Sequence, residues 1–293
     1  NAVRSIFQDR NGMLWFGSQG GASRYNPAAG PGPEAWTTYT TADGLGRGDP
    51  RLFFEDREGT LWAGTFGGLS RFDGHRFTTF SKVDGLADDQ VTDIHQDADG
   101  HLWIGTLGGG VSRYDGQVFQ TLTHHDGLAG LDIYDIEQDT NGDLWFASTS
   151  KGVTRYRPLP PSPPPVFVDA VVANRRYDAP SELSLSSAAA LIAFEFHGTS
   201  LRTQPGGMVY RYRLKGHDKT WQNTRATRVE YKDLPRGAYT FEVQAVDRDL
   251  VYSETPAAVA LTVRLPYERI GLLSALGIAV VLIGWQTVRV VRR

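Results

Sequence analysis

The chain has 293 residues and a formal net charge of −3. At roughly 100–200 residues per domain, this length accommodates two or three domains. The near balance of charges offers no broad basic surface, which argues against a nucleic-acid partner. The absence of cysteine excludes disulfides, thiolate zinc sites and cysteine nucleophiles. The 33 glycines, 12 tyrosines and 14 phenylalanines suit many short strands joined by tight turns.

A segment of the form Asp-x-x-Gly-x-Leu-Trp occurs four times in the first half of the sequence. Its copies cover residues 9–15, 56–62, 97–103 and 139–145, and the tryptophans are 47, 41 and 42 residues apart. A second motif, Asp-Gly-Leu, begins at Asp43, Asp84 and Asp126, each 19 positions before the next repeat tryptophan. Four short strands per roughly 40–45 residues are typical of β-propeller blades.

The third period illustrates the expected blade. Val91–Gln96 and Leu102–Thr106 alternate as strands around an Asp- and Gly-rich turn, and Gly110–Tyr114 and Val118–Leu122 complete the four. The last period has no fourth strand before a run of prolines. We therefore expect three complete blades and one incomplete blade over residues 1–157, in an open arc. Because the chain begins within a repeat, we also expect the native N-terminus, with any export signal, to be missing.

One tryptophan stands at the same position in every repeat, and we expect these side chains to pack between blades. They are the structural repeat residues Trp15, Trp62, Trp103 and Trp145. The Asp-x-(Asp/Asn)-Gly turns resemble half of a calcium loop, but the twelfth positions are Gly108 and Ser150 instead of glutamate. The sequence therefore predicts turns, with no metal site and no cofactor.

The full repeat reads Val-x-x-Ile-x-x-Asp-x-x-Gly-x-Leu-Trp-x-Gly-Thr, then Gly-Gly-(Val/Leu)-Ser-Arg-(Tyr/Phe)-Asp. This pattern resembles the two-component regulator propeller repeat over about residues 3–156. The last copy departs from it, because Ala147-Ser148 replaces Gly-Thr and Lys151-Gly152 replaces Gly-Gly. Relatives of this family carry more than four repeats, which also implies an open arc here.

A proline-rich run at residues 158–165 predicts an extended spacer. Residues 166–264 then alternate as strands, which predicts a fibronectin- or Ig-like β-sandwich. The segment Tyr210–Tyr239 also resembles the triple-tyrosine domain, which follows the propeller repeats in that family. The motif Leu234–Tyr239 resembles a tyrosine corner. The expected sandwich core residues are Tyr212, Trp221, Tyr231 and Tyr239.

One departure from that family lies near the end of the sandwich. The sequence Asp249-Leu250-Val251-Tyr252-Ser253 stands where the family usually has Asp-Gly-x-Trp-Ser. Loss of the glycine is expected to alter a hairpin turn.

Residues 270–288 form a run of 19 residues without charge. At ~1.5 Å per residue a helix of this length spans roughly the ~30 Å hydrocarbon core of a bilayer. Three arginines follow the run within residues 289–293, whereas only Arg269, beside Glu268, precedes it. The positive-inside rule then places residues 1–267 outside the cytoplasm. We expect one transmembrane α-helix after an all-β region, a short cytoplasmic stub, and a single-pass protein of the bacterial inner membrane.

Propellers usually bind ligands on one rim, through loops that enter and leave the innermost strands. Here the Asp-Gly-Leu connections are expected to form that rim, flanked by glycine turns near Gly67, Gly109 and Gly152. The candidate ligand contacts are Arg47, Asp49, Asp89, Gln90, His124 and Asp132. The alternative is that these are ordinary solvated loops.

The resemblance implies the extracytoplasmic ligand-sensing region of a single-span receptor, in most such proteins a two-component histidine kinase. Its ligand would be a small molecule or a glycan, and a homodimer of sandwiches and spans would pass the signal to a cytoplasmic domain in the same chain. Two alternatives stay open: a diguanylate cyclase output, and a membrane-anchored propeller enzyme acting on polysaccharide. The sequence has no Gly-x-Ser-x-Gly, Walker A or His-Glu-x-x-His motif. We therefore expect no catalytic residue and no enzymatic activity in this fragment.

Overall fold

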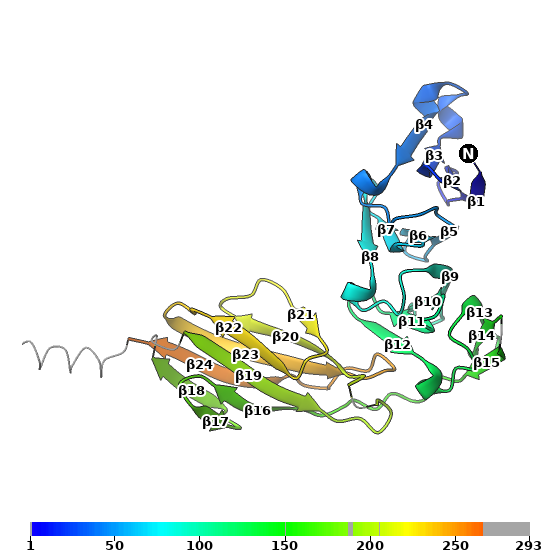
Figure 1. Cartoon of the computed structure of the whole chain (residues 1–293). Coiled ribbons are helices and arrows are strands. Elements are labelled where there is room, and N and C mark those ends of the chain that lie inside the picture. Colours follow the sequence, from blue (N-terminus) through cyan, green and yellow to red (C-terminus); the bar gives the residue numbers. More distant parts are fainter. Residues whose placement is uncertain (1, 150, 187–189, 205, 266–293) are drawn as a thin grey trace, which may run out of the picture. The chain divides into compact units, whose positions relative to one another are not determined.

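The computed structural model describes residues 2–149, 151–186, 190–204 and 206–265 (Figure 1). The expected span at residues 270–288 and the stub at 289–293 lie outside the described residues. Within the described ranges, no helix has the length and apolar character needed to cross a membrane.

The chain divides into two compact units. Unit 1 consists of Asn1–Pro163, Leu201–Val209 and Val246–Tyr252, and unit 2 of Pro164–Ser200, Tyr210–Ala245 and Ser253–Arg293. Two segments from the range expected to form the sandwich therefore belong to unit 1.

Unit 1 contains one antiparallel sheet for each sequence repeat (Figure 1). The strands are β1 (Val3–Gln8), β2 (Leu14–Ser18), β3 (Gly21–Tyr25) and β4 (Trp36–Tyr39); β5 (Leu52–Glu55), β6 (Leu61–Thr65), β7 (Gly68–Phe72) and β8 (Phe77–Phe80); β9 (Val91–Gln96), β10 (Leu102–Thr106), β11 (Val111–Tyr114) and β12 (Phe119–Leu122); and β13 (Ile133–Gln138), β14 (Leu144–Ser148) and β15 (Gly152–Tyr156). In every sheet, strands that follow each other in sequence are hydrogen-bonded neighbours. This confirms the predicted all-β, propeller-like repeat of four-stranded sheets, with three strands in the last.

The repeat aspartate closes the first hairpin of each blade. Its Oδ1 accepts backbone N–H groups of the turn, as Asp97 does from Asp99 and His101 at 3.0 and 2.9 Å. Its Oδ2 accepts the indole N–H of the repeat tryptophan, at 2.7 Å for Asp97 and Trp103 and at 2.8–2.9 Å in the other blades. The glycine of the motif has positive φ, for example +92° at Gly100, which residues with a side chain rarely adopt. The motif aspartate therefore both closes the turn and holds the tryptophan side chain by a hydrogen bond.

The repeat tryptophans lie between blades wherever a following blade exists. Trp15 is 1% exposed and contacts Phe53 and Phe77 of the second blade. Trp62 and Trp103 are equally buried, at 4% and 0%. Trp145, however, is 38% exposed, contrary to the expectation for this residue. The reason is that the described chain contains no further blade to cover the last sheet.

The Asp-Gly-Leu motif forms a short 3-10 turn in each connection, an element that the sequence did not reveal. These turns are η3 (Thr41–Asp43), η4 (Lys82–Asp84) and η5 (His124–Asp126), each closed by a capping box that the motif aspartate completes. The leucine is buried. The next N–H then donates to a hydroxyl of the following blade, in the pairs Gly46–Ser70, Ala87–Ser112 and Ala129–Thr154 at 2.8–3.0 Å. Each connection therefore ties two consecutive blades.

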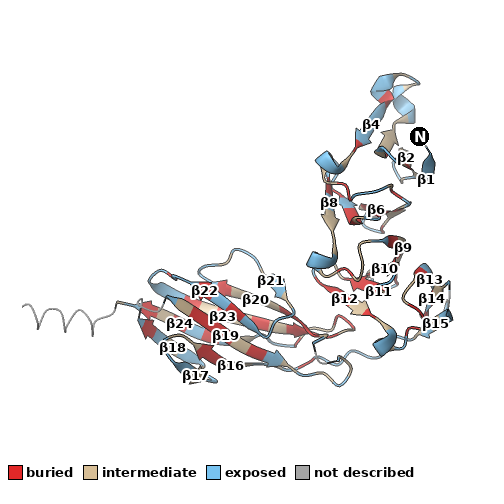
Figure 2. Cartoon of the chain, viewed as in Figure 1, coloured by how far each residue is buried: buried red, intermediate tan, exposed pale blue. Residues whose placement is uncertain are grey.

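Unit 2 contains two sheets, in the orders β17-β16-β19-β22 and β18-β24-β23-β20-β21. The strands are β16 (Val166–Val172), β17 (Arg176–Asp178), β18 (Glu182–Ser186), β19 (Leu191–Gly198), β20 (Val209–Lys215), β21 (Gln222–Thr224), β22 (Arg228–Lys232), β23 (Gly237–Val246) and β24 (Ala257–Arg264). Phe194 of one sheet stacks on Phe241 of the other, with ring centroids 4.0 Å apart. Buried residues alternate along β23 (Figure 2), as in a sheet with one face toward a core. The two sheets therefore form a sandwich.

The tyrosines expected in the sandwich core occupy three different environments. Tyr239 is buried, and its hydroxyl donates to the Pro235 carbonyl at 2.8 Å, which confirms the predicted tyrosine corner. Tyr231 is buried and donates to Asp218 at 2.6 Å. Tyr212 is only half-buried, and its hydroxyl donates to Gln222 at 2.9 Å.

Trp221 was expected in the sandwich core, and that expectation is wrong. Its ring is half-buried beneath the guanidinium groups of Arg211 and Arg213, which lie 5.4 and 4.4 Å from the ring centroid. Alternation along β20 explains this: Tyr210 and Leu214 point to the core, so the two arginines lie on the opposite face. Trp221 covers that outer face.

Candidate functional site

The Asp-Gly-Leu connections and the turns between the second and third strands lie at the same end of the blades. A Cβ on Gly67 would meet the Arg47 backbone nitrogen at 2.4 Å, and one on Gly109 would meet the Ala87 carbonyl oxygen at 2.6 Å. Only glycine permits so close an approach. We name the surface formed by residues 46–51, 66–67, 87–90, 107–110 and 129–132 the connection rim.

Two of the six predicted contact residues lie together on the first connection. Arg47 is exposed, and Asp49 is half-buried, with its carboxylate 3.4 Å from Nε of Arg4. Beside them the guanidinium of Arg51 lies 4.2 Å from the ring centroid of Phe66, which is 39% exposed. Phe66 also lies against Gly48, where an added Cβ would meet its own at 3.2 Å. We call Arg4, Arg47, Asp49, Arg51 and Phe66 the Phe66 cluster.

The other four predicted residues lie on the later connections, and two of them stabilise their own loops. Asp89 accepts the Lys82 backbone N–H at 2.8 Å, next to the start of η4. His124 donates through Nδ1 to the Leu128 carbonyl at 2.9 Å. The side chain of Gln90 is exposed and Asp132 is half-buried.

Sequence reasoning missed Arg4, Arg51 and Phe66 as members of this site. A repeat alignment contains the signal, because Arg4 and Arg51 both stand five residues before a repeat aspartate, and Phe66 replaces Leu107 of the third blade. The cluster carries three guanidinium groups against one carboxylate, so it is locally positive. An exposed ring beside guanidinium groups is suited to a ligand with a ring face and an anionic group.

Asp93 is an unusual carboxylate on the innermost strand of the third blade. Its Oδ2 accepts the Ile136 N–H of the fourth blade at 2.7 Å. Burial raises the pKa of Asp93 to about 6, helped by the nearby charges of Asp135 and Glu137 and opposed by the backbone hydrogen bonds. Near neutral pH this bond between blades is therefore made by a carboxylate that is costly to keep charged.

We expect Asp93→Asn to stabilise unit 1 at pH 8 by about 1–3 kcal/mol and to stabilise it by clearly less at pH 4.5. A raised carboxyl pKa means that the folded state holds the proton more tightly than the unfolded chain. The contribution of Asp93 is therefore most favourable below the unfolded pKa and declines as pH rises through about 6. The amide removes the charge and still accepts the Ile136 N–H. Urea unfolding of both proteins at the two pH values measures this, and an equal difference at both would contradict it.

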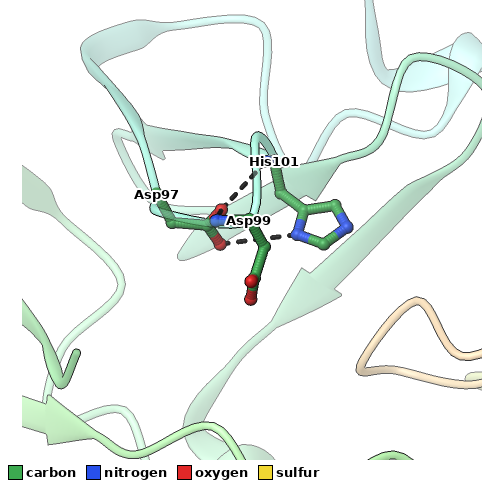
Figure 3. A group of neighbouring side chains, drawn as sticks. All are labelled: Asp97, Asp99 and His101. Carbon is green, nitrogen blue, oxygen red and sulfur yellow. Dashed lines mark hydrogen bonds and ion pairs between the residues drawn. The ribbon is translucent and has the colours of Figure 1, made fainter.

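The third blade also brings Asp97, Asp99 and His101 together, with ligand atoms within 4.8 Å of one another (Figure 3). Both Asp97 oxygens are already used by the turn and by Trp103. Arg113 lies 3.6 Å from Asp97 Oδ2, and its Nη2 lies 3.0 Å from Nδ1 of His101. A guanidinium in this position repels a cation, so we interpret the group as part of a buried polar network.

The charge state of Asp97 fits that interpretation. Burial opposes its charged form, but hydrogen bonds from His101 and Trp103, with the positive charge of Arg113, outweigh burial and hold the Asp97 pKa below its ordinary value. Asp97 is 2% exposed and Arg113 is 5% exposed. The network is therefore a buried ion pair with hydrogen bonds on both partners.

The segment Val246–Tyr252 is a hairpin that packs on the third blade within unit 1. Arg113 donates to the Asp249 carbonyl at 2.8 Å, and Gln120 donates to the Val246 and Asp247 carbonyls at 3.0 and 2.9 Å. Leu250 and Val246 join an apolar cluster with Val118 and Val209. We call this segment the docked hairpin.

The docked hairpin uses the same turn chemistry as the blade repeats. Oδ1 of Asp247 accepts the N–H groups two and four residues later, both at 2.9 Å. Leu250 takes positive φ, +59°, at the position where the repeats have glycine. The turn is therefore retained although leucine replaces the glycine. Leu250 adopts a strained backbone conformation, and burial of its side chain offsets the strain.

Two family models match the chain. Residues 1–20, 85–108 and 127–150 match the two component regulator propeller, and residues 203–264 match the Y_Y_Y domain. The chain contains two-component regulator propeller repeats and a Y_Y_Y domain. The Y_Y_Y match covers β20 to β24 of unit 2 together with the docked hairpin. No curated protein matches the sequence.

Several solved structures match parts of the chain at low identity. The extracellular domain of the hybrid two component system BT3049 from B. thetaiotaomicron is 22% identical, with TM-score 0.49, over 89% of this chain and 38% of that one. That of BT4673 from the same organism is 17% identical, with TM-score 0.41, over 92% and 51%. Virginiamycin B lyase from Staphylococcus aureus is 13% identical, with TM-score 0.37, over 87% and 84%. The chain thus spans about two fifths to half of the two sensor structures.

Proposed function

We propose that this chain is the extracytoplasmic ligand-sensing region of a single-span signalling receptor of the bacterial inner membrane. The observation that carries the proposal is the order of parts: two-component regulator propeller repeats, then a Y_Y_Y domain, then 19 uncharged residues followed by arginines. Residues 1–267 lie outside the cytoplasm in this proposal. In this proposal the chain binds a ligand and carries out no reaction.

The proposed output is a histidine kinase on the cytoplasmic side of the same chain, with a diguanylate cyclase as the alternative. Ligand would shift the relative placement of two Y_Y_Y domains in a homodimer, and the paired spans would carry that shift inward. Such a shift requires that the ligand bind the two arrangements with different affinity. The reading frame downstream of Arg293 distinguishes a kinase from a cyclase directly.

The proposed ligand contact is the connection rim, centred on the Phe66 cluster. Its local positive charge and exposed ring favour a small molecule or glycan that carries an anionic group. Arg51 and Phe66 would make the main contact, with Arg47 and Asp49 beside them. The rest of the rim, with Asp89, Gln90 and Asp132, and His124 on the adjoining η5 turn, would bind a longer ligand.

We expect Arg51→Ala to weaken binding of such a ligand by about 10-fold, since one charge-assisted contact contributes roughly 1–2 kcal/mol. The measurement is calorimetric titration of the chain with paired oligosaccharides that differ only in a carboxylate or sulfate. Arg71→Ala is the matched control, because Arg71 also lies over an aromatic ring of the second blade, 6.0 Å from the Phe80 centroid, but outside the rim. An equal loss of affinity in both variants, or no preference for the anionic oligosaccharide, would contradict the proposal that the Phe66 cluster binds the ligand.

A further inference from the structure

A cavity of about 410 Å³ opens between the first and second blades, at the end opposite to the connection rim. Its walls come from the β1–β2, β5–β6 and β7–β8 turns and from the strands beside them. The lining residues that bear on its chemistry are Asp9, Trp15, Arg24, Glu58, Phe72 and Asp73. All belong to unit 1. We call this cavity the open slot.

The first-blade wall of the open slot has the same repeat positions as the buried network of the third blade. Trp15 and Arg24 are cross-strand partners, and so are Trp103 and Arg113. The guanidinium lies over the indole in both, 5.7 Å from the centroid for Arg24 and 4.9 Å for Arg113. The two blades therefore present one tryptophan–arginine surface each.

The third-blade surface is occupied by the chain itself. Arg113 donates to the Asp249 carbonyl of the docked hairpin at 2.8 Å. Tyr156, at the repeat position of Phe72, donates to the Asp249 carboxylate at 2.6 Å. Among the described residues Arg24 has no ion pair, and its guanidinium lies over Trp15 and Tyr39 at the wall of the open slot.

The open slot is more acidic than the filled surface, although the two share the same core positions. On the filled surface Arg157 is paired with Asp143, which stands at the repeat position of Thr60 in the open slot. The filled surface receives an acidic hairpin, and the repeat positions of Glu58 and Asp73 are held there by Asn141 and Arg157. A hydrogen bond from Gln96 lowers the pKa of Glu58, and the N–H groups of Arg76 and His75 lower that of Asp73. Both carboxylates are thus charged at neutral pH. The open slot therefore has the tryptophan–arginine pair of the turn-binding surface, together with the additional carboxylates of Glu58 and Asp73.

We propose that the open slot binds a reverse turn of a partner polypeptide, with a backbone carbonyl held by Arg24 and a lysine or arginine side chain held by Glu58 and Asp73. The docked hairpin is the precedent within the same chain for a turn on this surface. The carboxylates of Glu58 and Asp73 favour a basic turn over an acidic one. This interaction is separate from ligand sensing at the connection rim.

Two cyclic peptides test the proposal. Both carry the turn Val246–Tyr252 closed head to tail, one unchanged and one with Asp249→Lys, and each is titrated into the full chain by fluorescence anisotropy at low salt. We expect the basic peptide to bind and the unchanged acidic peptide not to. The double variant Glu58→Gln, Asp73→Asn should weaken the basic peptide at least fivefold, as should Arg24→Ala.

Arg71→Ala is again the control and should bind the basic peptide as the unmodified chain does. Glu58 and Asp73 are surface carboxylates, so the double variant reports on binding even if Arg24→Ala disturbs the fold. Failure of the basic peptide to bind, equal binding of the acidic one, or binding unaffected by the double variant would each overturn the proposal.

Discussion

Asp97→Ala is expected to destabilise unit 1 by about 3–5 kcal/mol, because it leaves the buried Arg113 without its ion partner. The same change removes the acceptor of the Trp103 indole N–H and of two turn N–H groups. Buried donors left without acceptors add to the cost. Native-state hydrogen exchange of the β10 amides measures the loss in this blade.

Asp139→Ala is the matched control for that variant. Asp139 makes the same bond to its tryptophan at 2.9 Å, but Trp145 is 38% exposed, so water replaces the lost acceptor. We expect a loss of only about 1 kcal/mol there. Equal losses in the two blades would show that burial of the network does not set its contribution.

The Asp97 effect should also depend on pH. Because the Asp97 pKa is lowered in the folded state, its contribution is present above the unfolded value of 3.8 and is lost as pH falls through the folded value. The difference between the unmodified chain and Asp97→Ala should therefore shrink in strong acid.

Phe241→Ala is expected to destabilise unit 2 by about 3–5 kcal/mol, the usual cost of emptying a buried phenylalanine site. Phe241 is 0% exposed and contacts Phe194 and Phe196 of the opposite sheet. The cavity would separate the two sheets at their closest ring contact. Exchange of the β23 and β24 amides measures the loss.

Phe167→Ala provides the comparison within the same unit. Phe167 is 50% exposed and stacks on His197 near the surface, so we expect a change of less than about 1 kcal/mol. A small effect of Phe241→Ala would mean that the sandwich does not depend on this ring stack.

The turn chemistry of the repeat could be predicted from sequence because it is local. An aspartate accepts N–H groups two and four residues away, and a glycine three residues later supplies positive φ, so one short motif determines a hairpin. The tyrosine corner is local in the same sense, since Tyr239 and Pro235 are four residues apart. Strand alternation likewise specifies which residues of β23 face a core.

The candidate sites could not be predicted from local motifs, because their members are well separated in the sequence. Arg4 and Asp49 are 45 residues apart in sequence, and Arg51 meets Phe66 only across a turn of the second blade. The sequence suggests that Trp221 is a core aromatic. In the structure, two arginines of β20 lie over the face of its ring.

The sequence by itself determined the repeat, its strands, its turns and the order of propeller repeats and Y_Y_Y domain, since each rests on contacts within a few residues. Only the tertiary structure decided which of the equivalent repeat positions are covered by another part of the chain. Trp103 is buried and Trp145 exposed although both belong to one motif, and Arg113 binds the docked hairpin while Arg24 borders the open slot. The physical reason is that burial of a residue depends on which segment packs against it. Repeats with the same motif pack against different segments of the chain.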